Sequence, residues 1–186
     1  MAQLVARLNG IQKVSGSSPL SSTNHTHMKL KILYNAIIIK VIVLITLALD
    51  QWSKEKVLTY FQNSAHPNSA IEITDFFNIV LTWNYGISFG LFNNPQYDQS
   101  IFMIITSIII VGLILMFISH PKLQLPLGLI IGGAVGNLID RFKYGAVLDF
   151  IDFHWMQHHY PAFNLADSAI FIGAILLFIF EAKYKN

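Results

Sequence analysis

Residues 100–119, SIFMIITSIIIVGLILMFIS, form an apolar run that contains no charged residue. A helix needs about 20 apolar residues to cross the hydrocarbon core of a bilayer, which is about 30 Å thick. Because lipid offers no hydrogen bonds to the backbone, an apolar run of this length crosses a membrane as a helix. The run therefore predicts a membrane-spanning helix.

Three further runs have a similar character. Residues 123–141 and 163–180 are apolar except for one polar end each. Residues 37–58 are interrupted by Asp50 and Lys54, which stand at i and i+4 on one helix and can pair. The composition agrees, because only 12% of the residues are charged, against about 25% in soluble domains. We predict an all-α membrane protein with four transmembrane helices.

The beginning of the chain differs from the rest. Residues 1–27 are rich in Ser and Asn and contain no apolar stretch long enough for a signal peptide. From Met28 onward, lysines flank a growing apolar run, as at the start of an ordinary membrane protein. We expect residues 1–27 to be a disordered or non-native extension, and residues 28–186 to form a single four-helix domain.

The lysines predict the orientation of the spans. Lys40 precedes the first span, Lys122 lies between the second and the third, and Lys183 is near the end of the chain. With four spans these three places share one side, and the bias of basic residues makes that side cytoplasmic. Both termini are then cytoplasmic, and the segments 59–99 and 142–162 face outward.

The third span, residues 123–141, has a stripe of glycines along one face and a polar end. Gly128, Gly132 and Gly136 recur at every fourth position, with Gly133 beside them. Small residues at this spacing allow another helix to pack closely. We therefore expect close helix contacts along this stripe.

A polar cluster follows the glycines. Asn137, Asp140 and Arg141 stand at i, i+3 and i+4, so they share one helix face. We predict an ion pair between Asp140 and Arg141, which either belongs to a functional site or only fixes the helix end. Asp152, further out, is interpreted as an interfacial anchor.

Two more acids lie near the predicted outer boundary. Asn164 and Asp167 are three residues apart at the start of the last span, and Asp149 lies in the outward loop before it. Two neighbouring carboxylates cannot easily both ionise, so one keeps a proton at neutral pH. One can then activate water while the other acts on a carbonyl oxygen, as in an aspartic peptidase. Paired acids also occur in proton-coupled transporters and channels, which stay the alternative.

Other chemistries find less support. The chain has no Cys, and no Gly-x-Ser-x-Gly motif occurs. His154, His158 and His159 lack the His-Glu-x-x-His spacing of a zinc peptidase. A formal net charge of +2 without a basic stripe gives no sign of a nucleic-acid partner. We expect no metal, no other cofactor and no nucleic acid.

Five blocks of the sequence resemble, in order, the signature blocks of the bacterial lipoprotein signal peptidases (signal peptidase II), a family of aspartic peptidases. The blocks are LDQWSK (49–54), NYGISFGLF (84–92), GGAVGNLIDR (132–141), VLDFIDFH (147–154) and FNLADSAI (163–170). The resemblance implies that Asp149 and Asp167 are the catalytic aspartates. It also implies substrate-binding or site-supporting roles for eight residues: Asp50, Lys54, Asn84, Gly86, Asn137, Asp140, Arg141 and Asn164.

The resemblance further implies the activity and its place. Family members remove the signal peptide from a prolipoprotein by cutting before a diacylglyceryl-modified Cys, and globomycin targets them. We expect this precursor and membrane lipid as partners, and a monomeric enzyme in the bacterial inner membrane with its active site near the outer leaflet. Residues 76–83 are β-prone, and in the family such a segment belongs to a small extracytoplasmic sheet that cradles the substrate and is followed by a short outer helix.

Overall fold

The computed structural model describes residues 20–64, 70–86, 94–96 and 98–184. The chain divides into two compact units, Met1–Ile37 and Ile38–Asn186. In the first unit the described residues belong to helix α2 (Leu20–Asn63). Residues 20–27, expected to be part of an extension, are therefore helical, and residues 1–19 lie outside the described part of the chain.

The second unit holds the rest of α2, a small sheet and the remaining helices. These helices are α3 (Gln99–Ser119), the 3-10 turn η2 (Pro121–Leu123), α4 (Gln124–Tyr144) and α5 (Leu165–Tyr184). In the described part of the chain, three helices are long and apolar enough to span a membrane: Gln99–Ser119, Pro121–Tyr144 and Leu165–Lys183. These three confirm the predicted spans 100–119, 123–141 and 163–180. Residues 37–58 are helical within α2. That they form a fourth membrane span stays a prediction.

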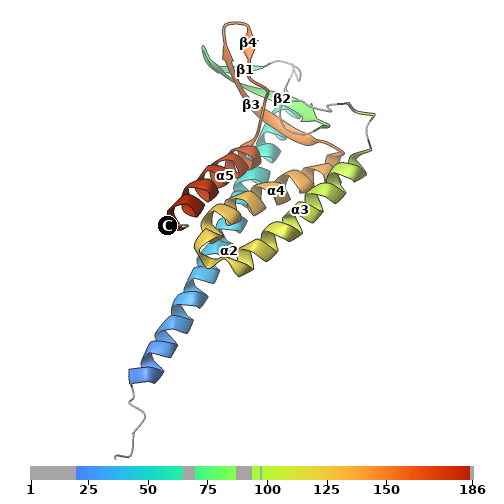
Figure 1. Ribbon diagram of the computed structural model, residues 1–186. Helices are drawn as coiled ribbons and strands as arrows, with labels where there is room; N and C mark the ends of the chain where they lie inside the picture. The colour runs from blue at the N-terminus through green and yellow to red at the C-terminus, as the bar shows by residue number, and fades with distance from the viewer. Residues whose placement is uncertain (1–19, 65–69, 87–93, 97, 185–186) are drawn as a thin grey trace, which may run out of the picture. The chain divides into compact units, whose positions relative to one another are not determined.

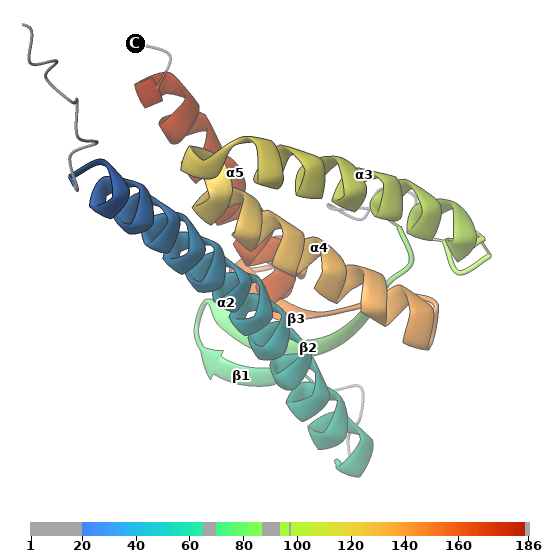
Figure 2. The same ribbon diagram turned by 90° about the horizontal axis from the view of Figure 1, so that it is seen from below.

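Helix α4 is the central helix of this unit, and its glycines explain why. A Cβ atom at Gly132 would lie 2.9 Å from the Cβ atom of Thr46 in α2, and one at Gly133 would overlap the backbone oxygen of Ala166 in α5. Only glycine allows both neighbours to approach this closely, which confirms the predicted close contacts along the stripe. Figure 2 shows α4 lying between α3 and the adjacent part of α2.

An antiparallel sheet lies at one end of these helices (Figure 1). Its four strands follow the order β1 (Ile71–Thr74), β2 (Phe77–Asn84), β3 (Val147–Trp155) and β4 (His158–His159). Strand β2 confirms that residues 76–83 are β-prone. The predicted short outer helix after it falls largely on residues 87–93, which lie outside the described part.

Strand β3 corrects the sequence interpretation, which treated residues 142–162 as an outward loop. Helix α4 ends where Gly145 adopts a left-handed conformation (φ 69°) and donates its N–H to the carbonyl of Arg141 at 3.0 Å. The chain then turns into β3, which pairs with β2 so that Asp149 lies opposite Thr82 and Asp152 opposite Asn78. The two acids of this segment are therefore held on a strand and not on a loop.

Candidate active site

Asp149 is buried in the middle of this arrangement, with only 2% of its surface exposed. Its Oδ2 atom accepts a hydrogen bond from the Nδ2 amide of Asn84 at 3.0 Å, and its Oδ1 atom accepts one from Asn164 Nδ2 at 2.7 Å. Asn84 ends strand β2 and Asn164 precedes helix α5. Three elements distant in sequence thus fix the orientation of one carboxyl group.

Asp167 lies in the first turn of α5, where Asn164 caps the helix. The backbone N–H of Asp167 donates to Asn164 Oδ1 at 2.9 Å, and Asp167 Oδ2 accepts from the backbone N–H of Asn164 at 3.3 Å. This reciprocal arrangement is a capping box, which satisfies backbone donors that a helix start otherwise leaves unpaired. Asp167 Oδ1 also accepts from Asn137 Nδ2 of α4 at 2.8 Å. Its carboxylate is thus fixed by both helices.

Both acids line one cavity of about 480 Å³. Its polar lining residues include Asn84, Asp149 and Asp167, and much of the rest is apolar, including Phe163 and Phe171. The site therefore places carboxylates against a space that can accept an apolar molecule.

The charge state of Asp149 follows from its surroundings. Burial raises the pKa of the Asp149 carboxyl to about 7, and the nearby Asp167 carboxylate acts in the same direction. Hydrogen bonds from Asn84 and Asn164 act in the opposite direction without cancelling the rise. Near neutral pH, Asp149 is consequently able both to hold and to release a proton.

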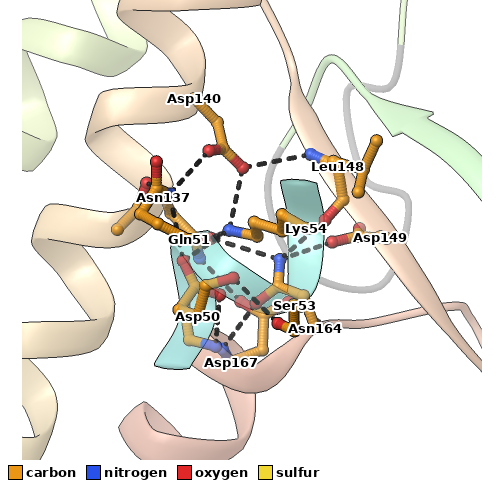
Figure 3. Close-up of polar contacts among 12 residues, drawn as sticks. Asp50, Gln51, Ser53, Lys54, Asn137, Asp140, Leu148, Asp149, Asn164 and Asp167 are labelled. Atoms are coloured by element: carbon orange, nitrogen blue, oxygen red, sulfur yellow. Dashed lines mark hydrogen bonds and ion pairs between the residues drawn. The ribbon is translucent and has the colours of Figure 1, made fainter. Parts of the chain in front are cut away.

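A second cluster lies beside the two acids and centres on Lys54 (Figure 3). The Lys54 ammonium lies 2.9 Å from Asp50 Oδ2 and 2.8 Å from Asp140 Oδ2, and it donates to Asn137 Oδ1 at 3.0 Å. The expected pairing of Asp50 with Lys54 is confirmed. A buried cation between two carboxylates holds α2 against α4.

The predicted ion pair between Asp140 and Arg141 is wrong. Asp140 pairs with Lys54 instead, and Arg141 donates from its guanidinium to the backbone oxygen of Gly86 at 2.7 Å. Adjacent residues on a helix point in different directions and do not face each other. Gly86 in turn donates its N–H to Asn84 Oδ1 at 3.0 Å, so Arg141 helps to fix Gly86 beside the end of β2.

The sequence interpretation missed one residue of these clusters, Gln51, and misplaced one residue of the sheet, Asp152. Gln51 donates to Asp140 Oδ1 at 2.9 Å and to the backbone oxygen of Gly136 at 3.3 Å. Its position three residues before Lys54 on the same helix was a usable signal. Asp152, interpreted as an interfacial anchor, is 6% exposed and accepts from Asn78 at 3.1 Å, so it is a buried residue of the sheet.

Hydrogen bonds and ion pairs join all of the predicted site residues into one network. Asn164 and Asn137 link the Asp149 and Asp167 pair to the Lys54 cluster, because Asn164 Nδ2 also donates to Asn137 Oδ1 at 3.2 Å. Fold and site together define a helical membrane protein whose buried polar site opens, through two carboxylates, onto an apolar cavity.

Comparisons with known proteins agree with this class. Residues 42–183 match the family model described as Signal peptidase (SPase) II. The chain is 44% identical over 142 residues to the lipoprotein signal peptidase of Shewanella oneidensis, covering 74% of this chain and 81% of that protein. It is 39% identical over 157 residues to that of Anaplasma phagocytophilum, covering 80% and 95% of the two chains. The chain belongs to the signal peptidase II family.

Other comparisons define the extent of the likeness. The lipoprotein signal peptidase of Rickettsia felis is 48% identical over 114 residues, which is 60% of this chain and 58% of that protein, so the match spans little more than half of that relative. A solved structure described as a bacterial membrane enzyme is similar with a TM-score of 0.67 and 31% identity, covering 78% of this chain and 88% of the other. The arrangement of helices and sheet is therefore that of a known membrane enzyme.

Proposed function

We propose that this chain is a membrane aspartic endopeptidase that removes the signal peptide from diacylglyceryl-modified prolipoproteins, cutting before the lipid-modified Cys. The observation that carries the proposal is the pair Asp149 and Asp167, which share one cavity in a chain of the signal peptidase II family. Asp149 has a pKa of about 7, which suits a group that must gain and lose a proton during each turnover.

The chemistry needs only the two carboxyl groups and one water molecule. One ionised carboxylate removes a proton from the water, whose oxygen attacks the carbonyl carbon of the residue before the Cys. The other carboxyl group, which is protonated, gives its proton to the carbonyl oxygen as that oxygen becomes tetrahedral. Collapse of the intermediate breaks the C–N bond: the Cys amine leaves with a proton from the first group, and the hydroxyl that becomes the new carbonyl returns its proton to the second group.

The surrounding residues support this chemistry by position. Asn84 and Asn164 hold Asp149 at 3.0 and 2.7 Å, and Asn137 holds Asp167 at 2.8 Å. Oriented amide donors of this kind fix a carboxylate before the substrate arrives, which lowers the cost of reaching the reactive geometry. The Lys54 cluster fixes Asn137 in turn.

We also propose how the chain lies in the membrane. Residues 37–58 of α2 would form the fourth span, with both termini in the cytoplasm and the site near the outer leaflet. Lys122 in η2 and Lys183 in α5 then lie on the cytoplasmic side, as the bias of basic residues requires. The sheet would cradle the substrate on the outer side, and the enzyme would act as a monomer.

A paired-substrate experiment tests the function. Purified protein in detergent is given one precursor in two forms, with and without the diacylglyceryl group. We expect release of the signal peptide from the lipid-modified form and much slower release from the unmodified one, because the cavity lining is largely apolar. An uncut lipid-modified precursor in the presence of well-folded protein would exclude the proposed activity.

A further inference from the structure

The segment after strand β4 forms one wall of the catalytic cavity. Residues 160–163 line this cavity together with Asp149 and Asp167. At one end of the segment, Phe163 exchanges backbone hydrogen bonds with Ile151 at 2.8 and 3.1 Å. At the other end, the Tyr160 N–H donates to the backbone oxygen of Phe153 at 2.8 Å. Both ends of the wall are thus attached to β3.

A side-chain contact between His159 and Asp152 reinforces the Tyr160 end of this wall. His159 Nδ1 lies 2.9 Å from both carboxylate oxygens of Asp152. Asp152 is buried and accepts from Asn78 Nδ2 of β2 at 3.1 Å. Strand β4 itself contains only His158 and His159. The contact of His159 with Asp152 therefore connects the very short strand β4 to the middle of the sheet.

The imidazole of His159 lies at the surface over a buried carboxylate, because the His159 side chain is 53% exposed and that of Asp152 is 8% exposed. The ring of His154 in β3 stacks on the His159 ring with 4.9 Å between the ring centres. His159 therefore contacts β3 through two of its side chains.

We propose that His159 is a positioning residue of the substrate cavity. Its contact with Asp152 fixes the wall formed by residues 160–163, and removal of the imidazole loosens that wall and weakens binding of the lipid-modified precursor. The proposal rests on the proposed function, because it concerns the substrate of the same site. His159 is not among the residues that line the cavity, so the effect belongs to KM and not to kcat.

Four proteins measured at one pH test this role: the wild type, His159→Ala, His159→Gln and His158→Ala. For His159→Ala we expect KM to rise about threefold with kcat unchanged, a modest change because the His159 side chain is half-exposed. His159→Gln, whose amide can still donate to Asp152, should keep a KM close to that of the wild type. His158→Ala is the matched control and should follow the wild type, because the exposed His158 side chain is not part of the contact.

A KM of His159→Ala equal to that of the wild type, or a KM of His159→Gln as high as that of His159→Ala, would overturn the proposal. Absence of cleavage by the wild type would instead count against the proposed function. Backbone hydrogen exchange gives a second test without catalysis. Protection of the Tyr160 amide should be about threefold lower in His159→Ala than in the wild type and in His158→Ala, and equal protection would contradict the role.

Discussion

Asp149 gives the candidate site its dependence on pH. Burial raises the pKa of this carboxyl to about 7, so the group is protonated below that value and ionised above it. If Asp149 supplies the proton to the scissile carbonyl, its ionisation removes the active form. We expect kcat/KM, which reports the free enzyme, to fall above pH 7 and to approach about a tenfold loss per pH unit. A flat profile from pH 6 to 9 would exclude Asp149 as the proton donor.

Lys54 is the residue whose loss should cost the fold most within the polar network. It is 5% exposed and lies between the carboxylates of Asp50 and Asp140. Lys54→Met leaves both carboxylates buried without their cation, at an expected cost of about 3–5 kcal/mol. Asp50→Asn leaves the contact of Lys54 with Asp140 in place, and we expect a smaller loss of about 1–3 kcal/mol.

Thermal unfolding in detergent and folded yield from the membrane measure this difference. The two variants change the same ion pair from opposite ends, so each serves as a control for the other. Equal stability of the two would show that Asp140 does not share the cation.

For single residues, the sequence predicted which residues belong to the site better than it predicted their hydrogen-bond and ion-pair partners. Asp50 and Lys54, four residues apart on one helix, were correctly paired because helical spacing determines which side chains meet. The same rule argues against an ion pair between Asp140 and Arg141, because adjacent residues on a helix do not face each other. The contact of Lys54 with Asp140 joins two helices, and only the packing of α2 on α4 reveals it.

Helix α4 depends on its glycines for contact with its neighbours. A Cβ atom at Gly133 would overlap the backbone oxygen of Ala166, and one at Gly136 would overlap the carboxylate of Asp50. Displacing a helix backbone or a buried, hydrogen-bonded carboxylate costs free energy. We expect Gly133→Ala and Gly136→Ala each to destabilise the protein by about 1–3 kcal/mol.

Gly112 of α3 provides the matched control, since no atom lies within 4 Å of a Cβ atom built there. Gly112→Ala should be neutral or slightly stabilising, because alanine favours a helix. Thermal unfolding of the three variants compares them directly. A loss at Gly112 as large as at Gly133 would show that the close contacts of α4 do not explain the cost.

The apolar runs predicted three helices closely, but the strand β3 was missed. Residues 147–155, VLDFIDFHW, carry two acids, and acids are uncommon in strands. Here the acids are accommodated because Asn84 and Asn78 of β2 donate to Asp149 and Asp152. Those partners are 65 and 74 residues away in the chain, a separation at which local patterns give no information.

At the scale of the whole molecule, the expected role of residues 1–27 stays a prediction. The described residues of the site all belong to the unit Ile38–Asn186, and the family match begins at residue 42. A protein that starts at Met28 should therefore insert and cleave at a rate within about twofold of the full-length chain. The polar residues that it lacks, 1–27, cannot form a core of their own. Cleavage rates of the two proteins, at equal amounts inserted in the same membranes, decide this. A large loss on truncation would show that the tail contributes to function.

The whole account depends on Asp149 and Asp167 acting together on a peptide bond. The most direct measurement is cleavage of a diacylglyceryl-modified precursor under single-turnover conditions by the wild type, Asp149→Asn and Asp167→Asn, with the product identified by mass spectrometry. Asn keeps the shape of Asp but cannot exchange a proton, so each variant should lose about 10³-fold or more in rate while it still folds and inserts. The wild type should release a protein that begins with the lipid-modified Cys. Appreciable turnover by either variant, or cleavage at another bond, would contradict the account.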